Sequence, residues 1–369
     1  MCVPSGTNPR DGGFHLGVFE EIVTYGHESV HFGHDPATGL RCIAAIHSTA
    51  LGQALGGTRF YPYRSDDDAM IDVLRLSRGM TYKAACAGIM QGGGKAVIIG
   101  DPTTHGTDAL FEAYGRFVDS LGGRYITAED VGTTVDNMHV VATQTNHVRG
   151  LPREDGGSGD PSPATARGVT AAMRAVSMRL WGTDDLQGRR IAIKGVGKVG
   201  MSLAERLSDR GAELVVADVN PAATAHAEAT FGAKVVSVEE VHTVDCDIFA
   251  PCALGADLNP SSIPELGCRA VAGSANNQLL TDGDADLLVD RGILYAPDYV
   301  VNAGGIINIA AEAGGYTADK AATMIDRIFD NLTEVFERAD RSGTNTHQAA
   351  EAMAEERIAA AKAHTGGTR

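Results

Sequence analysis

The chain has 369 residues, of which 43% are hydrophobic and 21% charged, and its formal net charge is −16. This length exceeds what a single ordinary hydrophobic core organises, so two domains are expected. The negative charge argues against nucleic acid or an anionic membrane as the partner, and no stretch approaches the roughly 20 apolar residues that a membrane-spanning helix needs.

The N-terminal segment, residues 1–17, lacks the basic start and apolar run of a secretory signal, and we expect it to be a disordered lead-in. Six cysteines are scattered without the close pairs that bind metal, which favours reduced thiols and a cytoplasmic location. His27, His31 and His34 surround an expected strand and turn, and we interpret them as polar surface. No metal site is expected.

The first half of the chain is predicted to be mixed α/β. Two β-rich runs between Ser29 and His47 flank a DPATG turn, which indicates a hairpin. Asp66–Ala87 has helical spacing of apolar residues and an acidic first turn. A buried strand at 95–100, a helix over Thr107–Leu121 and a strand at 124–130 complete this half.

The composition changes between Arg149 and Pro163, where seven of fifteen residues are Gly or Pro, and this predicts a hinge. Ser162 is the expected N-cap of the next helix. From Gly188 onward, short apolar strands alternate with helices, a pattern typical of a doubly wound parallel sheet. Two long helices, Asp319–Ala339 and Gln348–Ala363, are expected at the end.

The predicted fold class is therefore α/β with two domains and a cleft between them. Residues 1–150 would form a mixed-sheet domain, and residues 151–345 a doubly wound domain of the Rossmann type. Residues 346–369 would form a final helix that packs back on the first domain.

A G-x-G-x-x-G fingerprint carries the cofactor prediction. It follows an expected strand and opens a helix, and Asp218 ends the next strand about twenty residues later. The glycines would let the backbone approach a pyrophosphate at the helix N-terminus, and Asp218 would accept a hydrogen bond from a ribose 2′-hydroxyl, favouring NAD over NADP. Asp218 could instead be a strand-end turn former. The fingerprint comprises Gly195, Val196, Gly197, Lys198, Val199 and Gly200.

Two lysines in the first half occupy unusual surroundings. Lys83 lies in an otherwise apolar stretch, and Lys95 separates a glycine triplet from a buried strand. Lysines usually lie on solvated surfaces. If brought close, two ammonium groups would lower each other's pKa and make one amine available as a base. Asp130 ends a strand in the same half, where α/β sheets place their ligands.

These residues carry a resemblance. The segment GGGKAVIIGDP (92–102) is similar to the active-site signature of the glutamate/leucine/phenylalanine/valine dehydrogenase family, and the resemblance covers the chain nearly end to end, closest to the valine and leucine branch. Six further segments follow in the family's order. They are LGQALGGTRF (51–60), ITAEDVGTT (126–134), GDPSPATARGV (159–169), FAPCALGADLN (249–259), AGSANNQL (272–279) and DYVVNAGGIIN (298–308).

The resemblance implies a role for each matching residue. Lys83 would bind the substrate α-carboxylate with help from the backbone around Gly56 and Gly57, Lys95 would be the general base, and Asp130 would exchange a proton with the amine. Asn302 would hold the substrate, and Thr165 and Asn276 would position the nicotinamide. Further cofactor contacts are expected at Cys252, Ala253 and Asn277. The reaction implied is oxidative deamination of an L-amino acid by NAD⁺ in a homo-oligomer. Residues 1–150 would then be the substrate, catalytic and oligomerisation domain, and residues 151–345 the NAD-binding domain.

Two positions bear on the substrate. Glutamate enzymes of the family carry Lys where this chain has Leu55 and Ser where it has Ile309, and a buried unpaired carboxylate would cost several kcal/mol. With Met80, Ala128 and Ile306, these residues suggest an aliphatic pocket for valine, leucine or isoleucine, although they could be simple core. Phenylalanine is the alternative substrate.

Two other functional readings are weaker. A catalytically silent amino acid sensor should have lost Lys95, Asp130 or the glycine fingerprint, and all three are present. A hydroxy-acid dehydrogenase should offer a histidine–carboxylate pair beside a glycine-rich strand end, and no histidine occupies such a place.

Overall fold

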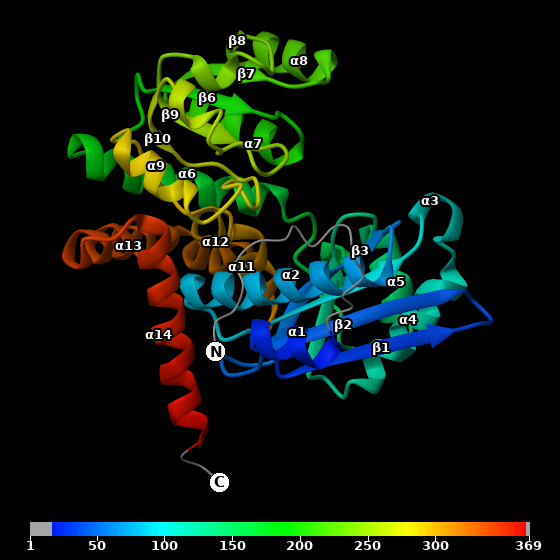
Figure 1. The fold of residues 1–369 in the computed structure, drawn as a ribbon. Coiled ribbons are helices and arrows are strands. Elements are labelled where there is room, and N and C mark those ends of the chain that lie inside the picture. Colours follow the sequence, from blue (N-terminus) through cyan, green and yellow to red (C-terminus); the bar gives the residue numbers. More distant parts are fainter. Residues whose placement is uncertain (1–16, 367–369) are drawn as a thin grey trace.

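The computed structural model describes residues 17–366, which form two lobes, each built around one β-sheet (Figure 1). The first sheet is mixed and the second is parallel, so the predicted two-domain α/β class is confirmed. The disordered lead-in was predicted for a segment of which only Gly17 lies within the described residues.

The first sheet has five strands in the order β1-β2-β4-β3-β5. The antiparallel pairs are β1 with β2 and β2 with β4, whereas β3 runs parallel to both β4 and β5. Its strands are β1 (Ser29–Asp35), β2 (Leu40–Ser48), β3 (Ala54–Tyr61), β4 (Gly92–Ile99) and β5 (Tyr125–Glu129).

Helices cover both faces of this sheet. On one face, α2 (Asp66–Ala87) buries Val73 and Leu74 against β2 and β4. On the other face, α4 (Asp108–Ser120) buries Phe111 and Tyr114. The predicted helix Asp66–Ala87 is confirmed at both ends. Its N-cap Ser65 accepts from the Asp68 N–H at 3.1 Å, and Gly88 terminates it in a left-handed conformation. The shorter helices are α1 (Val18–Tyr25), α3 (Pro102–His105) and α5 (Val135–Ala142).

Two features of this lobe differ from the sequence analysis. Strand β3 was not predicted as a strand because glycines at positions 56 and 57 lower strand propensity. His27 was interpreted as surface but is buried, with Nε2 2.7 Å from the Ser77 hydroxyl. Burial lowers the pKa of His27 to about 4, so this side chain is a neutral part of the interior.

The second sheet has six strands in the order β11-β10-β9-β6-β7-β8, all parallel, as a doubly wound dinucleotide domain requires. Its strands are β6 (Arg190–Lys194), β7 (Glu213–Ala217), β8 (Lys234–Val235), β9 (Cys246–Pro251), β10 (Cys268–Val271) and β11 (Leu294–Tyr295). The connecting helices are α7 (Lys198–Ser208), α8 (Pro221–Phe231) and α9 (Asp284–Asp290), with short 3-10 turns at Arg153–Asp155, Val241–Thr243 and Ile263–Glu265.

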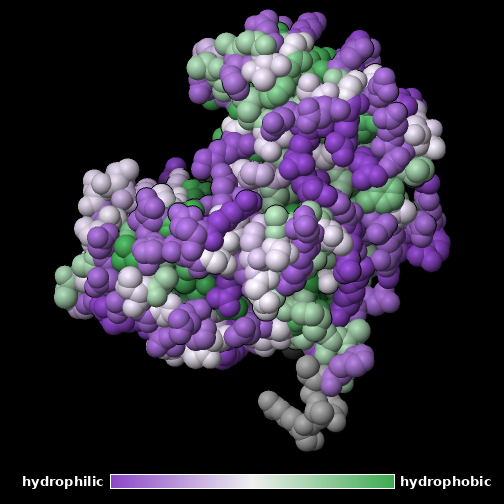
Figure 2. All heavy atoms as spheres, turned by 180° about the vertical axis from the view of Figure 1, so that it is seen from behind, coloured by the Kyte–Doolittle hydropathy of each residue, from purple (hydrophilic) through white to green (hydrophobic). Residues whose placement is uncertain are grey.

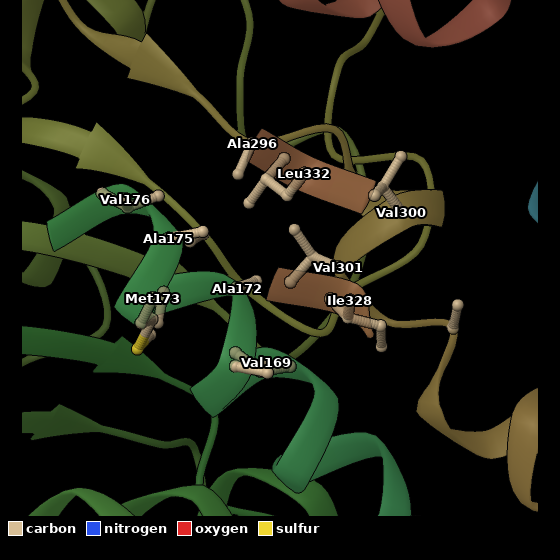
Figure 3. Close-up of a cluster of buried hydrophobic side chains, with 14 of the residues drawn as sticks. Val169, Ala172, Met173, Ala175, Val176, Ala296, Val300, Val301, Ile328 and Leu332 are labelled. Atoms are coloured by element: carbon tan, nitrogen blue, oxygen red, sulfur yellow. The ribbon is translucent and has the colours of Figure 1, made fainter. Parts of the chain in front are cut away.

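The long helix α6 (Ser162–Trp181) forms the base of this lobe. Figure 3 shows Val169 and Ala172 of α6 lying close to Val301 and Ile328, and all four side chains are buried in one apolar cluster. Ser162 was predicted as the N-cap, but the helix begins at Ser162 itself. The Asp160 carboxylate instead accepts from the Ser162 N–H at 2.8 Å, so it supplies an acceptor for one of the backbone N–H groups that have no partner within the helix.

The C-terminal helices surround α6 and return to the first lobe. They are α10 (Asp298–Val301), α11 (Gly304–Ala310), α12 (Ala318–Asp326), α13 (Ile328–Ser342) and α14 (Thr346–Gly366). One uninterrupted helix was predicted over Asp319–Ala339, but the structure has two helices, which are separated at Arg327. The Arg167 guanidinium of α6 binds both carboxylate oxygens of Asp326 at 2.8 and 2.6 Å, which fixes the end of α12.

Helix α14 packs against α2 of the first lobe (Figure 1). The Tyr82 hydroxyl donates to Glu355 at 2.9 Å, and the Arg357 guanidinium donates to the carbonyls of Ala85 and Cys86 at 3.0 and 2.9 Å. Arg357 thereby satisfies carbonyl oxygens at the C-terminus of α2, where a positive charge is favourable. Within residues 17–366, no helix has the length and apolar character needed to cross a membrane.

One buried carboxylate fixes the glycine-rich connection between the lobes. Glu312, which follows α11, is only 8% exposed. Its Oε1 atom accepts from the Gly150 N–H at 3.1 Å and from the Ser158 N–H at 2.8 Å. The Asn308 amide also donates to the Ser158 carbonyl at 3.4 Å. Both ends of the predicted hinge are therefore held by the segment that follows Asn302.

We expect Glu312→Ala to lower the free energy of unfolding by about 2 kcal/mol or more, because two buried backbone N–H groups lose their acceptor. Glu312→Gln keeps an oxygen in the same place and should lose less than half as much. Urea unfolding of the three proteins measures both effects. Equal losses in the two variants would show that the carboxylate charge, rather than these hydrogen bonds, stabilises the connection.

Candidate active site

The structure brings Lys83, Lys95 and Asp130 together at the border between the two lobes. The surface is hollowed between the lobes in the view from behind (Figure 2). Lys95 lies in β4, Asp130 follows β5, and Lys83 lies near the C-terminal end of α2. Parallel strands β3 and β5 end at this edge, where open α/β sheets bind ligands.

Lys95 and Asp130 form an ion pair. The Lys95 ammonium donates to Asp130 Oδ2, and Lys95 is only 6% exposed. Asp130 is itself fixed, since its N–H donates to the Thr133 hydroxyl at 2.9 Å and that hydroxyl donates to the Thr58 carbonyl at 3.0 Å. A buried lysine paired with a carboxylate is a group able to give and take a proton.

The pKa of Asp130 is lowered. Burial acts in the opposite direction, but the Lys95 ammonium beside it and the Arg59 guanidinium together outweigh that effect. Asp130 is therefore a carboxylate near neutral pH.

Glycines permit the close packing that builds this site. A Cβ at Gly93 would lie 2.2 Å from the Thr81 backbone nitrogen, so only glycine lets α2 approach β4 at this point. A Cβ at Gly56 would lie 1.8 Å from the Gly94 carbonyl oxygen, and one at Gly57 would lie 2.9 Å from Asp130 Cβ. The glycine pair and triplet singled out in the sequence thus set the distances between α2, β3 and β4.

Lys83 faces the second lobe. Its ammonium donates to Asn276 Oδ1 at 3.1 Å, which links the two lobes across the hollow. Desolvation lowers the pKa of Lys83 to about 8, Asp298 opposes the shift, and Lys95 adds to it. The lowered pKa was predicted from repulsion between two lysines. That prediction has the right direction for Lys83, but desolvation is the largest cause and Lys95 contributes less.

Asn302 has an acceptor that no protein group uses. Its amide nitrogen donates to Asn276 Oδ1 at 2.8 Å and to the Ser274 carbonyl at 3.2 Å. Its Oδ1 atom is buried and has no hydrogen-bond partner among the described residues. An unpaired buried oxygen beside Lys83 fits a ligand that carries an N–H donor, such as a substrate amine.

The residues predicted to line a substrate pocket come from both lobes. Leu55 and Ile306 are buried in one apolar cluster, and Met80 and Ile309 pack against it. Ala128 is buried in β5. The register pairs Gly57 with Ala128 and Leu55 with Gly93, so the alternation of side chains puts Leu55, Ala128 and Lys95 on one face of the sheet.

The glycine fingerprint has the geometry of a pyrophosphate site. Gly195 has φ of +98°, and a Cβ at Gly200 would lie 2.0 Å from the Gly195 carbonyl oxygen. A Cβ at Gly197 would meet nothing within 4 Å, so this glycine borders open space. No side chain caps α7 at Gly197, which leaves its first N–H groups free for an anion. Val196 is buried, Lys198 is exposed and Val199 is half-buried.

The other predicted cofactor residues surround this loop or the border between the lobes. Cys252 and Ala253 follow β9 and lie against Gly195. Asn277 is exposed and has φ of +52°. The Thr165 hydroxyl donates to the Pro161 carbonyl at 3.1 Å, and a Cβ at Gly305 would lie 3.1 Å from it.

Asp218 forms the strand-end turn that was the alternative interpretation of this residue, and it also binds the glycine loop. One carboxylate oxygen accepts from the Asn220 N–H at 2.8 Å, which makes a turn, and the other accepts from the Val196 N–H at 2.7 Å, which fixes the glycine loop. The carboxylate thus lies beside the fingerprint, where a ribose hydroxyl would be recognised.

Sequence reasoning missed three polar residues near Asp130. Arg59 lies between Asp130 and Asp72, and Tyr63 donates to Asp72 at 2.6 Å. A basic residue inside the glycine-rich segment 51–60 was a visible signal. Its partners, however, lie on a different element and could not be inferred from spacing.

Known proteins match this arrangement over most of the chain. Residues 27–147 match the family described as "Glu/Leu/Phe/Val dehydrogenase, dimerisation domain", and residues 156–223 and 219–366 match "Glutamate/Leucine/Phenylalanine/Valine dehydrogenase". The chain belongs to the glutamate/leucine/phenylalanine/valine dehydrogenase family. It is accordingly an amino acid dehydrogenase, and this family generally depends on NAD or NADP.

Relatives of the dehydrogenase act on several amino acids. It is 50% identical to a leucine dehydrogenase from Geobacillus stearothermophilus, covering 92% of this chain and 93% of the relative. A valine dehydrogenase from Streptomyces virginiae is 48% identical, covering 91% of this chain and 95% of the relative. The crystal structure of L-tryptophan dehydrogenase from Nostoc punctiforme superposes with a TM-score of 0.83 at 44% identity, covering 93% of this chain and 99% of that one.

The described part of the dehydrogenase has no grouping of side chains that could act as metal ligands. Between residues 17 and 366, no group of three or more His, Cys, Asp or Glu side chains is arranged to hold a metal ion. The five cysteines of this part are free thiols. The polar groups that converge on the hollow are instead lysines, a carboxylate and amides.

We expect Lys95→Ala to lower turnover of L-leucine about 10²–10⁴-fold, the range that general acid–base groups contribute, while NADH binding stays intact. Initial rates and NADH fluorescence titration measure the two effects. Lys234→Ala, a change at an exposed lysine on β8, is the control and should retain activity. Near-normal turnover in Lys95→Ala would remove Lys95 from the mechanism.

Proposed function

We propose that the enzyme oxidises branched-chain aliphatic L-amino acids to 2-oxo acids, with release of ammonium and reduction of NAD⁺. The observation that carries the proposal is the Lys95–Asp130 ion pair with Lys83 near it, together with an apolar cluster to which both lobes contribute, through Leu55 and Ile306. Relatives of similar length named leucine and valine dehydrogenase support the substrate class.

Each polar residue has a step that its surroundings suit. The Lys83 ammonium would bind the α-carboxylate of the substrate, and Asn302 Oδ1 would accept from its amine. Bound NAD⁺ supplies the hydride acceptor. Asp130 would take a proton from the substrate amine and return one to the departing ammonia. Lys95, once neutral, would take a proton from the water that attacks the iminium carbon.

The apolar cluster supports an aliphatic side chain. A glutamate γ-carboxylate next to Leu55 and Ile309 would be desolvated without a cationic partner, at a cost of several kcal/mol. One methylene changes binding by only about 1–3 kcal/mol, so leucine, isoleucine and valine should all react.

We further propose that the two lobes close about the connection between Arg149 and Pro163. Closure would bring the fingerprint loop toward Asp130 and exclude water from the imine. Lys83 and Asn276 already form a hydrogen bond between the lobes, which supports a closing movement of small amplitude.

Association of several copies is also part of the proposal. The match to a dimerisation domain over residues 27–147 supports it. Phe19, Val23 and Phe32 supply large exposed apolar side chains on α1 and on β1, and β1 is an edge strand of the first sheet. We propose a cytoplasmic location, supported by the free thiols.

The test of the substrate class is NADH production by purified enzyme with NAD⁺ and L-leucine, L-valine, L-isoleucine, L-phenylalanine or L-glutamate. We expect the three aliphatic substrates to have kcat/KM at least tenfold above phenylalanine and glutamate to be the poorest. A higher kcat/KM for phenylalanine than for the aliphatic substrates would leave the mechanism intact but contradict the proposed aliphatic pocket. Absence of turnover with all five, while NADH still binds, would favour a sensor.

The choice of NAD over NADP is proposed to depend on Asp218. Its carboxylate would repel a 2′-phosphate, so Asp218→Asn should narrow the ratio of kcat/KM for NAD⁺ over NADP⁺. Asparagine can keep one acceptor for the Val196 or Asn220 N–H, which limits damage to the loop. Glu213→Gln, at the exposed start of β7, is a charge-matched control. An unchanged ratio in Asp218→Asn would mean that another group reads the ribose.

A further inference from the structure

Arg59 occupies the space between two carboxylates. Its Nη1 atom donates to Asp72 Oδ2 at 2.8 Å, and its Nε atom lies 3.8 Å from Asp130 Oδ2. The second distance is too long for a hydrogen bond, so Arg59 acts on Asp130 through its charge. The Nε atom is buried and has no hydrogen-bond partner among the described residues.

The side chain of Arg59 is held from the other side. Asp72 of α2 binds its guanidinium, and the Tyr63 hydroxyl donates to the same Asp72 oxygen at 2.6 Å. Arg59 and Asp72 are each about one quarter exposed, at 24% and 28%, so solvent screens this ion pair only in part. A fixed guanidinium of this kind gives a constant field at Asp130.

The need for such a field follows from the proton chemistry, and this inference rests on the proposed function. A lysine base must be neutral before it can remove a proton from water, and Asp130, which must be ionised to take the proton of the substrate amine, then lacks the charge of its nearest partner. Arginine stays charged at every accessible pH. Arg59 is a cation beside Asp130 that keeps its charge when Lys95 is neutral.

We propose that Arg59 is a positioning residue that keeps Asp130 ionised in the resting site when Lys95 is neutral, so that Asp130 can take the proton of the substrate amine, and that Asp72, held by Tyr63, sets the strength of this effect. Other groups face Asp130 from the surrounding elements: Lys83 on α2, Lys95 on β4, and Glu129 and Tyr125 on β5. Arg59 differs from both lysines because it cannot lose its charge.

Two changes that each remove one charge should act in opposite directions. Arg59→Gln removes a positive charge, so protons are held more tightly and the acid limb of the kcat/KM profile should move up by about one pH unit. Asp72→Asn removes the opposing negative charge but keeps an acceptor for Arg59, so the limb should move down by a smaller amount. The limb belongs to the coupled Lys95–Asp130 pair rather than to one residue.

The experiment measures these profiles with L-leucine and saturating NAD⁺. Arg59→Lys keeps the charge and should restore the wild-type limb, and Arg41→Gln, in an exposed ion pair with Asp66, is the control. Shifts of opposite sign support the proposal. Shifts of the same sign, or an unmoved limb in Arg59→Gln, would show that Arg59 only joins β3 to α2 and would overturn it.

A second measurement does not depend on turnover. In urea unfolding, the change in midpoint caused by Asp130→Asn should differ between wild-type and Arg59→Gln backgrounds and be the same in an Arg41→Gln background. Absence of coupling to Arg59 would overturn the proposal even if the enzyme is active. A wild-type enzyme that fails to oxidise L-leucine, with coupling intact, would instead count against the proposed substrate.

Discussion

Close backbone packing at a few glycines is the constraint on which the rest of the site depends. Gly93 lets α2 lie against β4, and Gly56 and Gly57 let β3 lie against Gly94 and Asp130. A side chain at any of these positions would overlap a neighbouring backbone or side-chain atom. The result is that a helix and two strands bring two lysines, an arginine and a carboxylate into a small volume, where charges interact strongly because water is largely excluded.

Residues of the second lobe complete the candidate site. Asn276 accepts from Lys83, Asn302 at the end of α10 donates to the same Asn276 oxygen, and Ile306 belongs to the apolar cluster that contains Leu55. The same run of residues continues to Asn308 and Glu312, which hold the connection between the lobes. Asn302, which we propose to contact the substrate, and the residues that hold the connection between the lobes therefore belong to one short segment, so a ligand that shifts Asn302 would act directly on the connection.

The sequence was most informative where local signals agree. The ends of α2 were predictable because Ser65 and three acidic residues start the helix and Gly88 stops it. The fingerprint loop was predictable because strand, glycines and helix follow in order. Strand β3 and the first residues of β4 were not, since their glycines are explained only by neighbours distant in sequence. The interruption between α12 and α13 at Arg327 was not predictable, because no proline or glycine marks it. Arg167, which binds Asp326 at the end of α12, is distant in sequence.

The candidate site shows the same division. Lys95 and Asp130 could be singled out by residue type and surroundings, and the family resemblance supplied their roles. The pKa direction of Lys83 was predictable, but its main cause, desolvation, depends on how the lobes enclose it. No role could be predicted for Arg59, because its ion-pair partners, Asp72 and Asp130, lie on separate elements.

The return of α14 to α2 has a consequence for how the protein is made. Helix α2 carries Lys83, and its C-terminal turn rests on Arg357 and Glu355, more than 260 residues later in the chain. On the ribosome, this surface of α2 stays uncovered until α14 has left the exit tunnel, long after the first sheet can form. The helix that carries Lys83, the residue proposed to bind the substrate carboxylate, is thus among the last parts of the molecule to be fully packed, and a nascent chain stalled before α14 would present a folded sheet whose helix α2 lacks its final contacts.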